Sequence, residues 1–153
     1  MPNKKQKILI FFLFLYSAYC AILIGQSWDE NFHFSQGKIT FDYLLSFGRI
    51  DKDIFYREFY SPIYWTVQYF LTQIFPAKYQ IESSHLVNLI FSLSAIFALA
   101  KLSKELFNKE VSKIVFCILF FYPVFFGHMG FNSKDTILAF SHIWITYSFL
   151  RYI

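Results

Sequence analysis

The stretch "WDENFH" (28–33) places two neighbouring carboxylates and an imidazole directly after an uncharged apolar run. Two adjacent carboxylates in a partly desolvated site resist ionising together, so one of them can keep a raised pKa and act as a general base. In a helix, His33 would share a face with Asp29 and Glu30, and a carboxylate with an imidazole can also hold a divalent cation. Alternatively, these residues simply face water at the end of the apolar run.

A second cluster, "YREFYSP" (56–62), combines a guanidinium, a carboxylate and aromatic rings. Arg57 could bind a phosphate, because its planar guanidinium matches two phosphate oxygens at once. Tyr60 would then help to line a groove for a lipid chain. Alternatively, Arg57 and Glu58 pair with each other at the surface, which is common for adjacent charges.

A third cluster, "GHMGFNSKD" (127–135), gathers polar side chains between two apolar runs. Asn132, Lys134 and Asp135 suit a polar turn between two helices, and they suit a binding site equally well if they lie near the first cluster. Three polar residues inside the apolar runs are interpreted as structural hydrogen-bonding residues: His85, Asn88 and His142.

The composition predicts a membrane protein. The 153 residues are 56% hydrophobic, 24% aromatic and only 16% charged, which leaves too little polar surface for a soluble domain of this length. A spanning helix needs roughly 20 predominantly apolar residues. The prediction is therefore an all-α, polytopic membrane protein in which 1–153 form a single transmembrane module. Its elements are about four spans, at 8–25, 83–101, 114–130 and 135–151, and a membrane-parallel helix at 62–75.

The first outer loop is expected to carry further interfacial helices. One would begin at 32–36 and end at Gly37, and a second amphipathic helix would cover 39–47. Glycine is a common helix terminator. The second helix is compatible with the positions of its apolar residues, Ile39, Phe41, Leu44, Leu45 and Phe47.

The lysines predict the orientation in the membrane. Basic residues at 4–7 and at 101–113 fall on the same side only if 62–75 does not span, and such residues favour the cytoplasm. The N-terminus is then cytoplasmic, and all three polar clusters lie on the outer, periplasmic face. Because the lysines follow the membrane boundary, nothing here indicates nucleic-acid binding.

The order of these features resembles the start of the GT-C glycosyltransferases. It is most similar to bacterial, family 39-type relatives of the dolichyl-phosphate-mannose protein mannosyltransferases and of the aminoarabinose lipid A transferases. The matching pieces are "WDENFHF..G" (28–37), "EFYSPIYW" (58–65) and "GHMGFNSKDTILAF" (127–140). The last piece is similar to an H-x-x-x-N-x-K-D turn found in one branch of the family.

The resemblance implies an enzyme of a bacterial inner membrane that moves a sugar from a polyprenyl-phosphate donor to a glycan, lipid or protein acceptor, usually with inversion. It implies Asp29 as the general base with Glu30 in support. It gives substrate-binding roles to six further residues: Arg57, Glu58, Tyr60, Asn132, Lys134 and Asp135. Some relatives also hold Mg²⁺ or Mn²⁺, for which the candidate ligands are Asp29, His33 and Asp135, while others use no metal.

Full members of that family carry more spans and commonly a soluble C-terminal domain. The resemblance therefore implies a fragment, or an N-terminal part that needs a C-terminal partner and is inactive alone. The alternative is a small non-catalytic membrane subunit or assembly factor whose outer loop is a docking surface. An open reading frame for further spans downstream of Ile153 would favour the enzyme. A transporter fragment is disfavoured, because the polar residues gather at one face rather than at mid-membrane.

Overall fold

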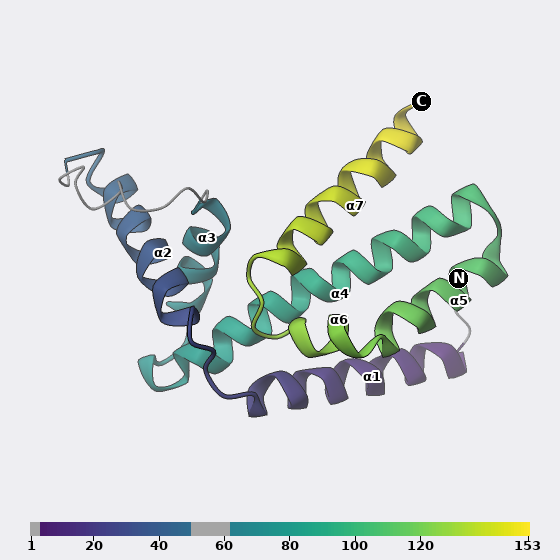
Figure 1. The fold of residues 1–153 in the computed structure, drawn as a ribbon, viewed down its shortest axis with the longest axis horizontal. Helices are drawn as coiled ribbons and strands as arrows, with labels where there is room; N and C mark the ends of the chain where they lie inside the picture. The colour runs from purple at the N-terminus through teal and green to yellow at the C-terminus, as the bar shows by residue number, and fades with distance from the viewer. Residues whose placement is uncertain (1–3, 50–61) are drawn as a thin grey trace.

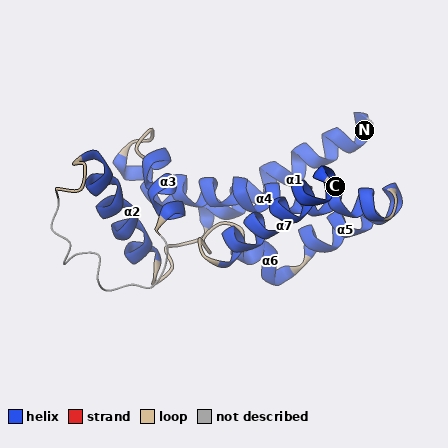
Figure 2. Ribbon diagram, turned by 90° about the horizontal axis from the view of Figure 1, so that it is seen from above, coloured by secondary structure: helices blue, strands red, loops and turns tan. Residues whose placement is uncertain are grey.

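The computed structural model describes residues 4–49 and 62–153 (Figure 1). Within these two ranges every regular element is a helix, as Figure 2 shows, so the all-α prediction is confirmed. The elements are α1 (Lys4–Leu23), α2 (Glu30–Leu45), α3 (Ile63–Thr72), the 3₁₀ turn η2 (Ala77–Tyr79), α4 (Gln80–Leu106), α5 (Lys109–Phe121), α6 (Pro123–His128) and α7 (Asp135–Tyr152).

The long helix α4 is the centre of the molecule. It packs against α7 on one side and against α1 and α5 on the other, while α2 and α3 form a separate pair beside its N-terminal end (Figure 1). The apolar core lies where α4 meets these neighbours. Its buried members are Ala21, Leu89, Leu93, Ile96, Phe120 and Met129.

Two helical segments of the described chain are long and apolar enough to cross a membrane: 4–23 and 77–106. They coincide with the predicted spans 8–25 and 83–101. The predicted span 114–130 is divided between α5 and α6, because Pro123 cannot continue the hydrogen-bond ladder of α5. The predicted span 135–151 corresponds to α7, which does not meet the same criterion of length and composition.

The helix α3 shows an unusual distribution of polarity. The prediction of a helix at 62–75 is met by Ile63–Thr72, with Pro62 just before its first turn. Its polar Gln68 and Thr72 are buried against the rest of the protein, whereas Ile63 is 73% exposed. Throughout the described chain, buried polar side chains accompany exposed apolar ones.

The prediction of two short helices separated at Gly37 was wrong. Residues Glu30–Leu45 form one continuous helix. Gly37 lies inside it because the backbone of α3 passes directly over this position: a Cβ on Gly37 would lie 2.3 Å from the carbonyl oxygen of Trp65. Instead, α2 ends where Phe47 and Gly48 adopt positive φ angles of 54° and 79°.

Most of the described basic residues lie at one end of the molecule. The start of α1, the end of α4, the start of α5 and the end of α7 all lie at the right of Figure 1, whereas α2, α3 and the start of α7 lie further left. The basic residues at the first end are Lys4, Lys5, Lys7, Lys101, Lys104, Lys109, Lys113 and Arg151.

Candidate functional site

Asp29 lies directly before α2, where its carboxylate meets groups from two segments. Its Oδ1 accepts a hydrogen bond from the Ser27 hydroxyl at 2.6 Å. Its Oδ2 lies 3.7 Å from Lys134 Nζ and 3.8 Å from His33 Nε2. The structure thus brings the first and third polar clusters together, and the Asp29 side chain stays 30% exposed beside them.

The surroundings of Asp29 set its protonation. Burial raises the pKa of this carboxyl, but the Ser27 hydrogen bond and the electrostatic interactions with His33 and Lys134 together bring it below its usual value. Asp29 is therefore ionised at neutral pH and can accept a proton. The expectation that one of the two carboxyls keeps a raised pKa is not met at Asp29, because its nearest partners are the Ser27 hydroxyl, Lys134 and His33 rather than a second carboxylate.

His33 lies one turn further along α2, and only 4% of its side chain is exposed. Its ring stacks on Trp65 of α3, with ring centroids 4.3 Å apart. Its Nδ1 lies 3.1 Å from the Ser133 hydroxyl, which also accepts a hydrogen bond from Trp65 Nε1 at 3.1 Å. Burial lowers the pKa of His33, so the imidazole is neutral at pH 7.

The remaining ring nitrogen of His33, Nε2, is buried and makes no hydrogen bond to any described residue. It faces Asp29 Oδ2 at 3.8 Å, which is too long for a hydrogen bond. If the Ser133 hydroxyl donates to Nδ1, then Nε2 carries the hydrogen and points it at the carboxylate. The chain from Trp65 through Ser133 to His33 thus orients a donor toward the candidate base.

Glu30 is engaged on the opposite side. Its Oε1 lies 2.6 Å from Nε2 of His85 in α4, and its Oε2 accepts the backbone N–H of Ser27. Nδ1 of His85 lies 2.9 Å from the carbonyl oxygen of Ala21. A carbonyl only accepts, so Nδ1 carries a hydrogen and a second proton is shared between Nε2 and Glu30. This pair links α2 to both α1 and α4.

Asn132 and Asp135 organise the turn before α7. The Asn132 side chain donates to Asp135 Oδ2 at 3.0 Å, and its oxygen accepts the backbone N–H groups of Lys134 and Asp135. Asn88, which is fully buried in α4, donates to the carbonyl oxygens of Met129 and Asn132 in the same turn. The turn therefore presents Lys134 to Asp29 and uses its other polar groups internally.

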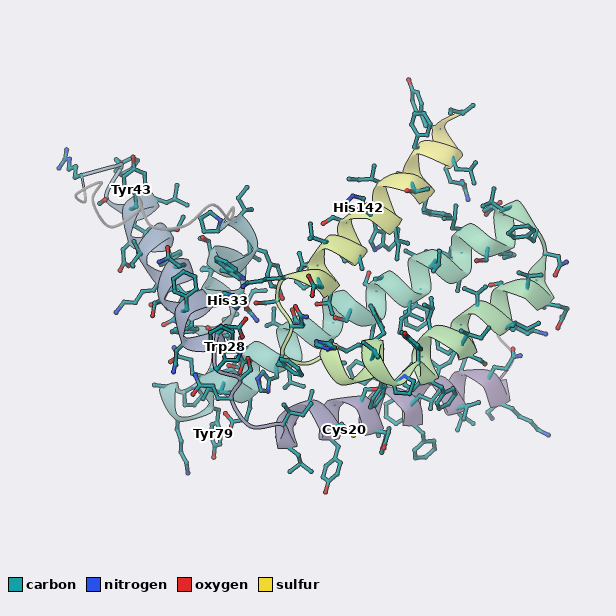
Figure 3. All side chains as sticks on the ribbon, viewed as in Figure 1. Cys20, Trp28, His33, Tyr43, Tyr79 and His142 are labelled. Atoms are coloured by element: carbon teal, nitrogen blue, oxygen red, sulfur yellow. The ribbon has the colours of Figure 1, made fainter. Side chains whose placement is uncertain are left out.

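The sequence reasoning missed the parts that His85 and Asn88 play in positioning the site. An ionisable residue within an apolar helix was the available signal for His85, since burying such a group is costly without a partner. The structural interpretation of His142 agrees with its position: it lies on α7, apart from His33 (Figure 3), and its Nδ1 contacts the Leu138 carbonyl oxygen.

Arg57, Glu58 and Tyr60 lie outside the described residues. For the metal hypothesis, no set of three or more His, Cys, Asp or Glu side chains in 4–49 and 62–153 is placed to hold an ion. Asp29 and His33 lie together, whereas the Asp135 carboxylate accepts from Asn132.

The geometry that defines this site is a partly exposed, ionised carboxylate with a cation and a neutral imidazole beside it, at the end of the molecule away from most of its basic residues. Comparisons of the chain with protein-family models, with curated proteins and with solved structures found no match.

Proposed function

We propose that this chain is a membrane-embedded module of a glycosyltransferase that uses a polyprenyl-phosphate sugar as donor, with Asp29 as the general base. The observation that carries the proposal is the Asp29 carboxylate itself. It is fixed by Ser27, remains partly exposed, and lies 3.7 Å from the ammonium group of Lys134. A base and a cation held side by side are what the transfer of a sugar from a phosphate to a hydroxyl requires.

The distribution of polarity supports embedding in a membrane. Apolar side chains of α1 face outward, with Phe12 61% and Leu23 65% exposed, while Ser17 on the same helix is buried. Between membrane helices, packing uses small and polar residues, and lipid covers the apolar ones. We infer about four spans, formed by α1, α4, α5 with α6, and α7.

The charge distribution supports an orientation for these spans. The end that carries the lysines at 4–7 and 101–113 would be cytoplasmic, because basic residues flanking spans are retained on that side. Asp29 and Lys134 would then face the outer side, as in a bacterial inner membrane. The short helix α3, on which Ile63, Val67 and Phe70 are exposed, would lie along the membrane surface.

The proposed reaction is an inverting displacement. The hydroxyl oxygen of the acceptor bonds to the anomeric carbon of the donor sugar, and Asp29 takes the hydroxyl proton. The bond from that carbon to the polyprenyl phosphate breaks, and the phosphate oxygen keeps the electron pair. Lys134 would stabilise the charge that develops on the phosphate.

The low pKa of Asp29 fits a late proton transfer. A carboxylate is a weak base toward a free hydroxyl, but the hydroxyl becomes strongly acidic once its oxygen has begun to bond to an oxocarbenium-like carbon. Asp29 is ionised at neutral pH and can therefore accept the hydroxyl proton at that stage. His33, neutral and oriented by Ser133, would hold that carboxylate through its Nε2 when the site closes on substrate.

The test is sugar transfer by the natural gene product, including any segment encoded beyond Ile153, in proteoliposomes with a radiolabelled polyprenyl-phosphate sugar. Asp29→Asn keeps the shape and removes the base, so kcat should fall by about 10²–10⁴-fold. Asp42→Asn, which alters a carboxyl further along the same helix, should transfer normally. Transfer by Asp29→Asn at the rate of the natural protein would refute the assignment.

A second candidate function is a non-catalytic subunit or assembly factor. It is favoured by the internal use of Glu30, Asn132 and Asp135, whose side chains hydrogen-bond within the protein as structural groups do. In that case neither Asp29→Asn nor Asp42→Asn alters sugar transfer in the cell membrane. Instead, Asp29→Asn reduces the amount of a partner protein that is purified together with this chain. The two carboxyl variants therefore separate the two functions.

A further inference from the structure

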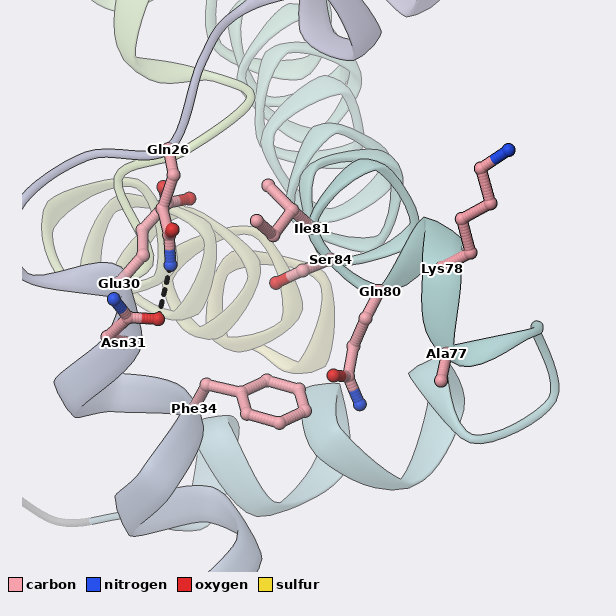
Figure 4. A pocket seen from close by; sticks show the side chains of 9 residues that line it. All are labelled: Gln26, Glu30, Asn31, Phe34, Ala77, Lys78, Gln80, Ile81 and Ser84. Carbon is pink, nitrogen blue, oxygen red and sulfur yellow. Dashed lines mark hydrogen bonds between the residues drawn. The ribbon is translucent and has the colours of Figure 1, made fainter.

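A pocket separate from the Asp29 cluster lies between the first turn of α2 and the beginning of α4 (Figure 4). Its volume is about 190 Å³, and neither Asp29 nor Lys134 lines it. Pockets for drug-sized ligands usually measure roughly 300–1,000 Å³. This one has room for a single small ring.

Two charged residues line the pocket, and neither directs a free charge into it. Both carboxylate oxygens of Glu30 are engaged, one with His85 and the other with the backbone N–H of Ser27. The ammonium group of Lys78 points away from the other lining side chains (Figure 4) and lies 5.4 Å from the centre of the Tyr79 ring. Because the Glu30 charge is compensated and the Lys78 ammonium is directed outward, the groups that face the pocket suit an uncharged ligand.

The polar side chains of the pocket are amides and a hydroxyl. Gln26 donates to the side-chain oxygen of Asn31, which leaves the Gln26 oxygen and the Asn31 amino group available. The side chains of Gln80 and Ser84 make no hydrogen bond to any described residue, and both line the same pocket. These groups together both donate and accept, which matches the hydroxyl groups of a sugar.

Phe34 supplies the apolar wall. Its ring lines the pocket beside the Gln80 amide (Figure 4) and is fixed by an edge-on contact with Tyr69, with centroids 5.0 Å apart. A sugar ring carries its C–H bonds on two faces and its hydroxyls around the rim, so one face can lie on an aromatic ring while the rim meets amides. We propose that this pocket binds one uncharged pyranose ring.

The pocket lies at the same end of α2 as Asp29, since Glu30 and Asn31 line it. The donor needs a cation for its phosphate, and that cation is Lys134, on the Asp29 side. The ring in this pocket therefore belongs to the acceptor. This last step rests on the proposed function, whereas binding of a sugar does not.

Saturation-transfer NMR on the full chain in lipid nanodiscs tests the pocket without catalysis. The probes are methyl α-D-mannopyranoside and methyl β-D-glucopyranoside, with glycerol as the non-ring control. We expect saturation to pass from the protein to the ring protons of at least one glycoside, and none to pass to glycerol. Gln80→Ala and Asn31→Ala should each weaken binding about five- to tenfold, the effect of losing a neutral hydrogen bond.

The matched control is Gln73→Ala, which removes a glutamine that lies outside the pocket and bonds only to the Tyr69 carbonyl oxygen. It should leave the affinity unchanged. Any of three results would overturn the proposal. These are no saturation signal from either glycoside, a signal that is undiminished in both pocket variants, and a signal that inorganic phosphate displaces.

Asp29→Asn separates the pocket from the proposed function. It should bind the glycosides like the natural chain, because Asp29 does not line the pocket. If this variant binds the glycosides and also transfers sugar normally, Asp29 is not the general base, whereas the proposal of a sugar-binding pocket is retained. Loss of transfer without any glycoside binding in the natural chain would refute the pocket alone.

Discussion

The contact of α2 with α3 at Gly37 gives a sharp prediction, because two glycines in helices of this protein have opposite surroundings. Gly37 meets the Trp65 backbone, where a Cβ would lie 2.3 Å from the carbonyl oxygen and 2.7 Å from the carbonyl carbon. Gly127 in α6 has no atom within 4 Å of the position of a Cβ. The same substitution, glycine to alanine, should therefore stabilise at one position and destabilise at the other.

The magnitudes follow from helix propensity and overpacking. Alanine in place of glycine favours a helix by about 1 kcal/mol, and Gly127→Ala should gain about that amount. At Gly37 the same gain opposes a clash with backbone atoms, which cannot rotate away as a side chain can. Overpacking costs about 3 kcal/mol at the upper end of its usual range. Gly37→Ala should therefore lower the free energy of unfolding by about 2 kcal/mol, roughly a thirtyfold shift in the unfolding equilibrium.

The measurement is reversible unfolding in mixed detergent micelles, followed by tryptophan fluorescence. Trp65 lies at the contact itself, and replacing Trp28 and Trp144 by Phe in every variant makes the remaining signal report the separation of α2 from α3. Equal stability of Gly37→Ala and the natural chain, or a gain similar to that of Gly127→Ala, would refute the close packing of these helices. It would also remove the reason why His33 stacks on Trp65.

Two further predictions concern buried polar groups, both measured as free energies of unfolding. Asn88→Ala removes an amide whose two N–H groups face three acceptors and whose oxygen accepts from the Tyr64 hydroxyl, so it should cost about 3 kcal/mol. Asn108→Ala removes only the N-cap of α5 and should cost about 1 kcal/mol. Equal losses would contradict the role of Asn88. Burial lowers the pKa of His33 from its ordinary value of 6.5, so the unfolded chain binds this proton more tightly than the folded chain does. The free energy of unfolding should therefore fall as the pH decreases from 7 through 6.5, and this loss should stop once the pH is below the folded-state pKa. His33→Gln should remove that part of the pH dependence, and an unchanged slope would contradict the burial of a neutral imidazole.

The sequence was informative where one chemical rule dominated. The spacing in "WDENFH" placed Asp29 and His33 one helical turn apart, and this is how they lie, with Asp29 directly before α2 and His33 in its first turn. Gly37 was misinterpreted because glycine serves both to end helices and to admit a neighbouring backbone, and the sequence does not say which. The contact that decides between them comes from Trp65, which is distant in the chain.

The position of Lys134 beside Asp29 follows from two residues of α4 that lie three apart and so share one face. His85 holds Glu30, the neighbour of Asp29, and Asn88 holds the turn that carries Lys134. The rise of an α-helix separates these two anchors by about 4.5 Å along the axis, so both segments are held beside the same turn of α4. Buried polar groups of the central helix thus place the candidate base. These groups lie far from "WDENFH" in the sequence, so the motif alone could not predict the position of Asp29 beside Lys134.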